Sequence, residues 1–322
     1  MPFLLERIEN GVNMDTFIQQ IINGLVLGSM YALIALGYTM VYGVLNLINF
    51  AHGDVLMIGA MVGLSILNLL AWLVPGLPGY MNLAIAILGA IPACMLVNVL
   101  IERIAYRRLR NAPRLAPLIT AIGVSILLNA FAMKAWGRNP LSFPQLLSSE
   151  PIHIGGAVIS QTQVLLLALA LLCMGALVIL VERTKLGRAM RATAENPRVA
   201  GLMGVDANKV IVATFAIGAA LAAVAGVMWG ANYSSIHFAM GFLPGLKAFS
   251  AAVLGGIGNI YGAMLGGILL GLIEALGAGY IGDLTGGVLG SHYQDIFAFI
   301  VLIIVLTIRP SGIMGERVAD RA

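Results

Sequence analysis

Long runs of apolar residues, separated by short polar stretches, dominate this chain. Several of the runs exceed about 18 residues, enough to cross a hydrocarbon core about 30 Å thick at a rise of about 1.5 Å per helical residue. We therefore predict an all-α, polytopic bundle of membrane-spanning helices. Its eight long spans are expected at residues 16–36, 54–73, 82–101, 116–136, 162–181, 210–231, 262–281 and 293–308.

Two shorter apolar segments, at residues 38–52 and 244–258, complete the pattern. Each follows a long span and precedes two more, so the order long, short, long, long occurs at both ends of the chain. This order suggests an internal structural repeat, and paired short, glycine-interrupted segments indicate a substrate pathway in transporters. The pattern leaves open whether both segments cross the membrane, which gives ten spans, or re-enter it, which gives eight.

Composition supports the membrane assignment. Charged residues make up 10% of the chain and the mean hydropathy is +0.97, whereas soluble domains carry about 25% charged residues. Small residues also recur four positions apart, a spacing typical of closely packed membrane helices. The predicted contact faces are Gly262/Gly266, Gly267/Gly271 and Ala222/Gly226/Gly230.

The distribution of basic residues predicts the topology. Fourteen of the 18 lysines and arginines lie in three stretches next to spans, at residues 103–114, 182–209 and 309–321. By the positive-inside rule these stretches are cytoplasmic, and the proline-rich loop 137–161 is external. Because each of these basic stretches adjoins a span, we do not expect them to bind nucleic acid. We divide the chain into an N-terminal extension (1–15), a transmembrane domain (16–309) and a cytoplasmic C-terminal tail (310–322).

The polar stretch 182–209 contains a predicted short helix at residues 197–203. Asn196 is a good N-cap, Pro197 suits the first helical position, and Gly204 suits the left-handed position after the helix. A capped helix with apolar side chains in a cytoplasmic loop predicts a docking site for a partner. The candidate docking residues are Arg191, Glu195, Asn196, Pro197, Val199, Ala200, Leu202, Met203 and Gly204.

The first short segment gathers four polar side chains within nine residues: Asn46, Asn49, His52 and Asp54. Backbone groups at membrane depth need partners that lipid does not offer, so such residues suit a non-helical stretch that lines a cavity. An interfacial turn in which Asp54 caps the next helix fits the same residues. The two interpretations are compatible, and we take all four as candidate residues of a translocation path.

The second short segment adds closely spaced glycines, of which Gly256 and Gly258 are candidates for the same path. Glu274 lies well within the span 262–281, where an ionisable group is expected to face protein or water. It either belongs to the path or forms a structural hydrogen bond with a neighbouring helix.

The sequence shows no recognisable catalytic motif. The phosphate-binding pattern G-x-x-x-x-G-K-[ST] is absent, and Cys94 and Cys173 lack the spacing of a zinc site. We therefore expect no enzymatic activity, cofactor or metal in this chain. If ATP drives transport, another chain must hydrolyse it.

Three stretches carry a resemblance to a known family: TKLGRAMRATAENPRVAGLMGV, NGLVLGSMYALIALGYTMVYGVLNLINFAHGDVLMIGA and KAFSAAVLGGIGNIYGAMLGGILLGLIEAL. They resemble permeases of ATP-binding-cassette importers, and the branched-chain amino acid type more than the sugar or urea types. The resemblance extends from Asp15 to Gly315, while residues 1–13 depart from the usual start of the family.

This resemblance implies a subunit of the bacterial inner membrane that transports leucine, isoleucine and valine. It implies four kinds of partner: a second related permease, two cytoplasmic ATPase subunits that bind ATP and Mg²⁺, a periplasmic amino-acid-binding protein and the surrounding lipid. One alternative is the same architecture importing urea or short amides. Another is a secondary transporter or channel that acts alone.

Overall fold

The computed structural model describes residues 14–110, 112–113, 115–147, 150–154, 156–284 and 294–315. Most of the predicted N-terminal extension, and the predicted tail beyond residue 315, lie outside these ranges. The helices are α2 (Met14–Leu45), α3 (His52–Leu73), α4 (Gly79–Ile101), α5 (Arg107–Leu109), α6 (Leu115–Trp136), α7 (Gln161–Arg183), α8 (Lys185–Glu195), α9 (Pro197–Leu202), α10 (Ala207–Tyr233), α11 (Phe242–Gly255), α12 (Ile260–Leu284) and α13 (Gln294–Ile308).

The remaining regular elements are short. A π-helical turn, η1 (Glu102–Tyr106), joins α4 to α5. Strand β1 (Leu141–Ser142) pairs with β4 (Ser235–Ile236), and β2 (Pro151–Ile154) pairs with β3 (Ala157–Ser160) as an antiparallel hairpin.

The predicted polytopic helical bundle is confirmed. Among the described residues, seven helices are long and apolar enough to cross a membrane: α2, α3, α4 with its extension to Leu109, α6, α7, α10 and α12. The expected count of eight long spans is not reproduced, because the predicted span 293–308 forms the 15-residue helix α13.

The two short segments differ from each other. Residues 38–45 continue α2 without a break, and residues 46–51 form a non-helical connection to α3. The segment 244–258 instead forms most of α11. A separate short segment after the first span is therefore wrong, and the long, short, long, long order does not occur at the N-terminal end.

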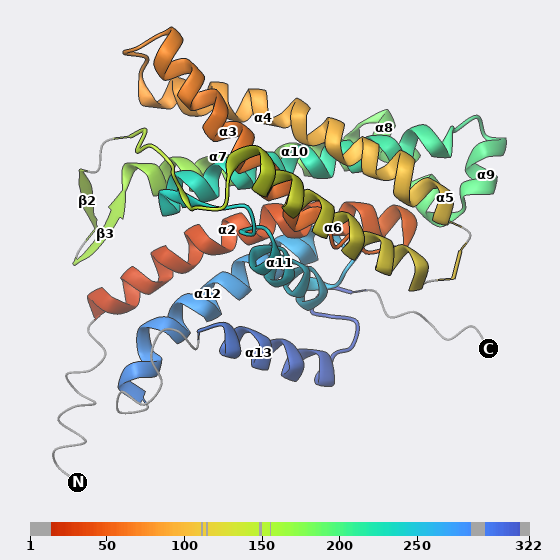
Figure 1. Ribbon diagram of the computed structural model, residues 1–322. Coiled ribbons are helices and arrows are strands. Elements are labelled where there is room, and N and C mark those ends of the chain that lie inside the picture. The colour runs from red at the N-terminus through yellow and green to blue at the C-terminus, as the bar shows by residue number, and fades with distance from the viewer. Residues whose placement is uncertain are drawn as a thin grey trace.

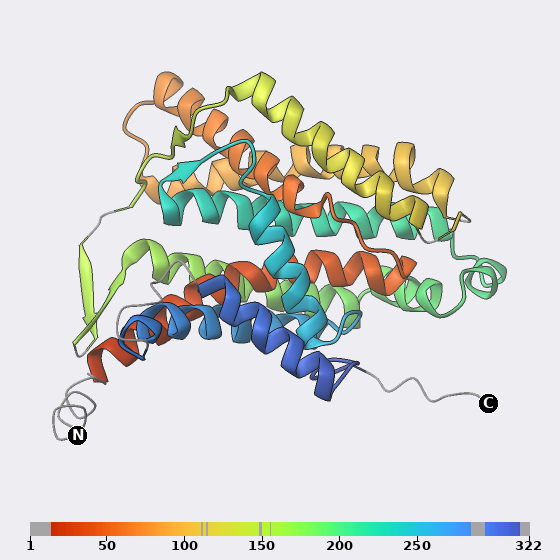
Figure 2. The same cartoon turned by 60° about the horizontal axis from the view of Figure 1, so that its bottom comes forward.

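Helices α2 and α10 form the centre of the bundle (Figure 1). On one side α2 packs against α12, and on the other side α10 lies between α2 and the pair α3 and α4. Helix α11 runs obliquely across the long helices, as Figure 2 shows, and contacts α12, α2 and α3. The long helices lie roughly alongside one another, so the bundle has two ends.

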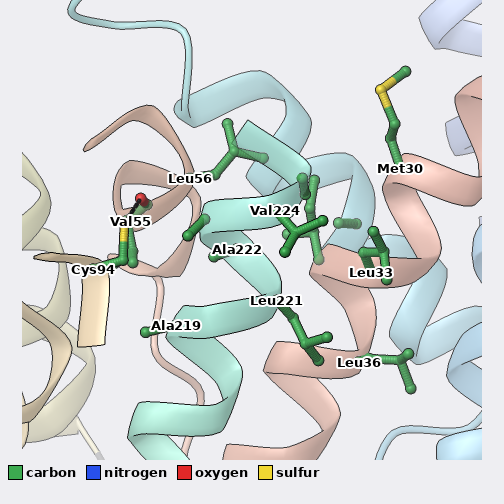
Figure 3. Close-up of a cluster of buried hydrophobic side chains, with 14 of the residues drawn as sticks. Met30, Leu33, Leu36, Val55, Leu56, Cys94, Ala219, Leu221, Ala222 and Val224 are labelled. Atoms are coloured by element: carbon green, nitrogen blue, oxygen red, sulfur yellow. Dashed lines mark hydrogen bonds between the residues drawn. The ribbon is translucent and has the colours of Figure 1, made fainter. Parts of the chain in front are cut away.

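Apolar side chains of α2, α3 and α4 pack around those of α10 (Figure 3). Leu33 and Leu36 of α2 face Leu221 and Val224 of α10, while α3 and α4 approach α10 from its other side. All of these residues are buried. The central helix α10 is thus enclosed by protein.

Small residues set the close approach of the helices, as the sequence predicts. A Cβ atom added at Gly271 would lie 2.3 Å from Gly28 Cα in α2, and one added at Gly267 would lie 2.4 Å from Ala32 Cα. A Cβ added at Gly226 of α10 would lie 2.2 Å from a carbonyl oxygen of α3. Only glycine fits at these contacts, because such distances are far below van der Waals separation.

The two ends of the bundle carry different elements. The start of α2 lies beside the β2–β3 hairpin (Figure 1), where the Gln19 side chain accepts a hydrogen bond from Val158 N at 2.7 Å and donates one to Val158 O at 3.0 Å. Helices α5, α8 and α9 lie at the opposite end. Two of the three basic stretches therefore meet at one end, and the hairpin of the loop 137–161 lies at the other.

Candidate functional site

Helix α8 is anchored to the end of α7. The Thr184 hydroxyl caps α8 by accepting a hydrogen bond from Gly187 N at 3.1 Å. A Cβ added at Gly187 would lie 2.0 Å from Val181 O, so α8 approaches α7 more closely than a larger residue would allow. The Arg191 guanidinium donates to the same carbonyl oxygen. Because α8 also buries Met190 against the bundle, it is fixed relative to the spans.

Helix α9 follows at once and has the predicted caps. The Asn196 carboxamide oxygen accepts hydrogen bonds from Arg198 N at 3.0 Å and Val199 N at 3.1 Å, and Pro197 occupies the first helical position. Gly204 has a φ of 86°, the left-handed conformation that favours glycine. The helix ends at Leu202, one residue earlier than predicted.

The apolar residues of α9 separate into an outer and an inner face. Leu202 and Met203 are 87% and 82% exposed, and Val199 is also exposed. Ala200 is only 3% exposed, so its expected role as a partner contact is wrong: its side chain packs against the chain itself. Glu195, at the end of α8, is exposed. The exposed apolar residues of α9 that remain as candidates for the predicted docking surface are Val199, Leu202 and Met203.

The start of α10 connects this loop to α4. Asp206 caps α10, and the backbone N–H groups of Lys209 and Asn208 that it accepts from hold the pKa of its carboxyl below the usual value. The Asn208 carboxamide oxygen accepts a hydrogen bond at 2.7 Å from Arg110, which also forms an ion pair with the buried Glu102 of η1. Helix α10 and the π-helical turn are thereby joined by one side chain.

A cavity of about 750 Å³ opens at the same end of the bundle. It lies between the end of α2, the α7–α8 junction, the α11–α12 turn and residues 310–315. Two residues of the predicted path line it: Asn46, which has a φ of 53°, and Gly258, which has a φ of 100°. Arg191 of α8 lines it as well, so the cavity and the docking loop share a wall.

Gly256 lies beside this cavity with a structural role. It has a φ of 107°, and a Cβ added there would lie 2.4 Å from Gly315 N. The C-terminal segment crosses at this point, because Met314 N donates to Gly255 O at 2.9 Å and Asn259 donates to Met314 O at 3.0 Å. Residues 310–315 are therefore fixed to the α11–α12 turn.

Asn49 does not line the cavity. It is buried, and its carboxamide donates to Asn98 Oδ1 at 3.4 Å and accepts from the Tyr106 hydroxyl at 3.1 Å. Asn98 in turn donates to Phe215 O of α10 at 2.7 Å. This network joins the α2–α3 connection to α4, η1 and α10, so the structure places Asn49 in an interhelical contact and outside the lining of this cavity.

His52 and Asp54 are buried at the start of α3 as well. The His52 ring packs 4.9 Å from the ring of Tyr38, centroid to centroid, and fills the space beside Gly37. Asp54 accepts a hydrogen bond at 2.8 Å from Asn129 of α6. Of the four polar residues in this segment, only Asn46 is open to the cavity.

Glu274 is buried in a cluster that the sequence reasoning missed. Lys247 Nζ of α11 lies 2.6 Å from Glu274 Oε1 and 2.6 Å from Asp295 Oδ1 of α13. The Tyr31 hydroxyl of α2 donates to Glu274 Oε2 at 3.1 Å. Glu274 thus bonds with neighbouring helices, as the structural alternative expects. A signal was present, because Lys247 is a lone basic residue in an apolar segment.

Comparison with known proteins agrees with this architecture. Residues 20–306 match a family model described as "Branched-chain amino acid transport system / permease component". The chain belongs to this permease family.

Curated relatives of the permease extend over nearly its whole length. It is 46% identical over 308 residues to the high-affinity branched-chain amino acid transport system permease protein BraD of Pseudomonas aeruginosa, covering 93% of this chain and 96% of the relative. It is 44% identical over 306 residues to LivH of Escherichia coli K12, with the same coverage. The probable LivH of Methanocaldococcus jannaschii is 30% identical over 297 residues, covering 90% of each chain.

The arrangement places two candidate functional regions at one end of the permease. One is the exposed apolar surface of α9, and the other is the cavity beside α8. Helix α8 borders the cavity and leads directly into α9, so the two regions are connected by one short helix.

Proposed function

We propose that this permease is the membrane subunit of an ATP-binding-cassette importer that carries leucine, isoleucine and valine across the bacterial inner membrane. Two separate ATPase subunits bind ATP and Mg²⁺ and supply the energy. A second, related permease and a periplasmic amino-acid-binding protein complete the complex. The permease itself contributes the path and the contact through which ATPase closure is transmitted.

The observation that carries this proposal is the exposed apolar surface of α9. Leu202 and Met203 are almost fully exposed. They lie at the end of a helix that is capped at both ends and attached to the bundle through α8. A transporter that acts alone has no evident use for a rigid apolar surface in a basic loop. The names of the curated relatives support branched-chain amino acids as the substrates.

The basic stretches support an orientation. The basic stretches 103–114 and 182–209 include helices α5, α8 and α9, which lie at one end of the bundle. The positive-inside rule assigns this end to the cytoplasm. Residues 310–315 are bonded to the α11–α12 turn beside the cavity at that end, which supports a cytoplasmic C-terminus. The start of α2 then lies outside, beside the β2–β3 hairpin.

Uptake into proteoliposomes tests the proposal. The complete complex, with its purified binding protein outside and ATP inside, is expected to accumulate radiolabelled leucine, with isoleucine and valine as competitors. Urea and acetamide should compete weakly. Uptake of urea in preference to leucine would assign the other importer type. Leucine uptake that persists without ATP, or with a hydrolysis-deficient ATPase, would show a secondary transporter or channel.

A further inference from the structure

The 750 Å³ cavity has the size of a ligand site. Small-molecule pockets in proteins measure about 300–1,000 Å³ and combine apolar walls with a few polar groups. The lining here has both kinds of surface. Met40 and Val44 of α2 and Ile257 of the α11–α12 turn supply apolar area, and charged and polar residues face the same space.

The charged lining residues carry opposite signs. Glu182 and Arg191 both line the cavity, from the end of α7 and from α8. Each is held by one partner, because the Tyr261 hydroxyl donates to Glu182 and Arg191 donates to Val181 O. A guanidinium has five N–H donors and a carboxylate has about four acceptor positions, so both groups keep capacity for a ligand.

One buried lining group lacks a partner. The Thr39 hydroxyl forms no hydrogen bond with the described part of the chain, although Thr39 is 1% exposed. Burying a hydroxyl without a hydrogen bond is unfavourable. The more accessible Asn46 adds a carboxamide at the edge of the same cavity. The lining therefore combines charged groups of both signs and neutral polar groups with an apolar wall.

We propose that this cavity binds an aliphatic L-amino acid on the cytoplasmic side of the permease, after its release from the path. The α-ammonium group pairs with Glu182, the α-carboxylate pairs with Arg191, and the branched side chain contacts the apolar wall. This inference rests on the proposed function for its ligand class. It adds a ligand-binding site within this one subunit, and this site has a consequence for the regulation of transport.

The consequence follows from the position of α8. Arg191 lies on α8, which continues through Asn196 into α9. Helix α8 is already attached to α7 through the Thr184 cap and the Arg191–Val181 hydrogen bond. A ligand that also bridges Arg191 to Glu182 strengthens this attachment against the shift that ATPase closure imposes on α9. Because α9 carries the proposed ATPase contact, an occupied cavity lowers transport. The importer is thus inhibited by its own product from the cytoplasmic side.

Cysteine protection tests binding at the site. Asn46→Cys, in a Cys173→Ala background with the buried Cys94 retained, is labelled with a small maleimide in the purified complex without binding protein. Leucine is expected to slow labelling at least about fivefold. 4-Methylpentanoate, which lacks the ammonium, and 3-methylbutylamine, which lacks the carboxylate, should protect weakly. Arg108→Cys on α5, at an exposed residue outside the cavity lining and outside α9, is the control, and its labelling should not respond to leucine.

Variants of the lining separate binding from folding. Thr39→Val and Glu182→Gln are expected to raise the leucine concentration for half-protection by about tenfold or more, since Thr39→Val removes the unpaired hydroxyl of the lining and Glu182→Gln removes the partner of the ammonium. Glu195→Gln, on α8 but outside the cavity, should leave it unchanged. Leucine loaded inside proteoliposomes should inhibit uptake in the parent complex and much less in Glu182→Gln.

Uptake from outside distinguishes the two proposals. If the complex imports leucine but neither protection nor inhibition by internal leucine is seen, the cavity proposal is wrong and the proposed function stands. Equal protection by all three compounds also overturns the cavity proposal, because it shows a merely apolar site. If the complex does not import leucine, the proposed function fails and the ligand assignment fails with it.

Discussion

The Lys247 ammonium lies 2.6 Å from the Glu274 carboxylate, and both side chains are buried among the helices. Lys247 also lies 2.6 Å from Asp295, so one cation joins α11 to α12 and α13. Removing one member of a buried ion pair typically costs about 3–5 kcal/mol, because a charge is left uncompensated. The cluster therefore holds the two short helices in place.

We predict that Lys247→Met lowers the stability of the permease markedly, since two carboxylates then face each other without the cation. Adding Glu274→Gln should recover part of the loss, because one of the two charges is removed. Lys134→Met, at an exposed lysine near the end of α6, is the matched control. Thermal unfolding of the detergent-purified protein measures all three. Equal midpoints for Lys247→Met and the control would show that the ion pairs contribute nothing.

The α9 surface gives a prediction about coupling. Leu202→Asp should reach the membrane and fold, because Leu202 is 87% exposed, yet it should lose most of the ATPase subunit on purification. A few central contacts of an interface contribute about 2 kcal/mol or more, and the aspartate adds the cost of burying an unpaired charge in the contact. Arg103→Gln, an exposed change at the same end of the bundle, should keep the ATPase. Normal ATPase recovery and uptake in Leu202→Asp would place the docking contact elsewhere.

The α9 region also shows how far local sequence carries a prediction. The caps at Asn196 and Gly204 depend only on residues within one turn of the helix. They could therefore be predicted from the sequence alone. Which side chains of α9 face outward depends on how α9 lies against the rest of the chain, and Ala200 was misassigned for that reason. A charged variant at Ala200 would disturb packing and would not test docking.

Other features depended on contacts between distant residues. The apolar run through residues 38–45 fits a separate segment or a longer helix equally well, and the packing of α2 against α12 and α10 decides for the helix. Lys247, Glu274 and Asp295 meet only because three helices converge. The glycine contact faces were predictable, since close helix packing in membranes requires small residues at that spacing.

A third prediction concerns Arg110 as a positioning residue. Its guanidinium reaches both Glu102 of η1 and Asn208 of α10. Lysine keeps the charge but lacks the planar fork that serves two partners. We expect Arg110→Lys to fold and to retain the ATPase, and to transport less leucine per ATP hydrolysed. Arg108→Lys, at an exposed neighbour, should keep the parent ratio.

A double-mutant cycle with Asn208→Ala checks this interpretation. If Arg110 acts through Asn208, the two changes should couple by about 0.5–3 kcal/mol in stability, and the double variant should have the transport ratio of the worse single variant. A purely structural role would lower the amount of folded protein and leave the ratio of transport to ATP hydrolysis unchanged. That result would show that Arg110 does not affect the coupling of transport to ATP hydrolysis.

The last prediction concerns the contact between α2 and α12. A Cβ at Gly271 would lie 2.3 Å from both the Cα and the N of Gly28, and backbone atoms cannot move aside as a flexible side chain can. Gly271→Ala should therefore force α2 and α12 apart. Overpacking of this kind typically costs about 1–3 kcal/mol, and the displaced helices also carry Tyr31 and Glu274, which bond across the same interface. Gly175→Ala in α7 is the matched control, because no atom lies within 4 Å of its added Cβ. There alanine should be neutral or stabilise the helix by up to about 1 kcal/mol. The yield of assembled complex and its unfolding temperature measure both variants. A Gly271→Ala protein as stable as Gly175→Ala would mean that α2 and α12 are not in close contact, and the packing of α12 against the central helix α2 would have to be revised.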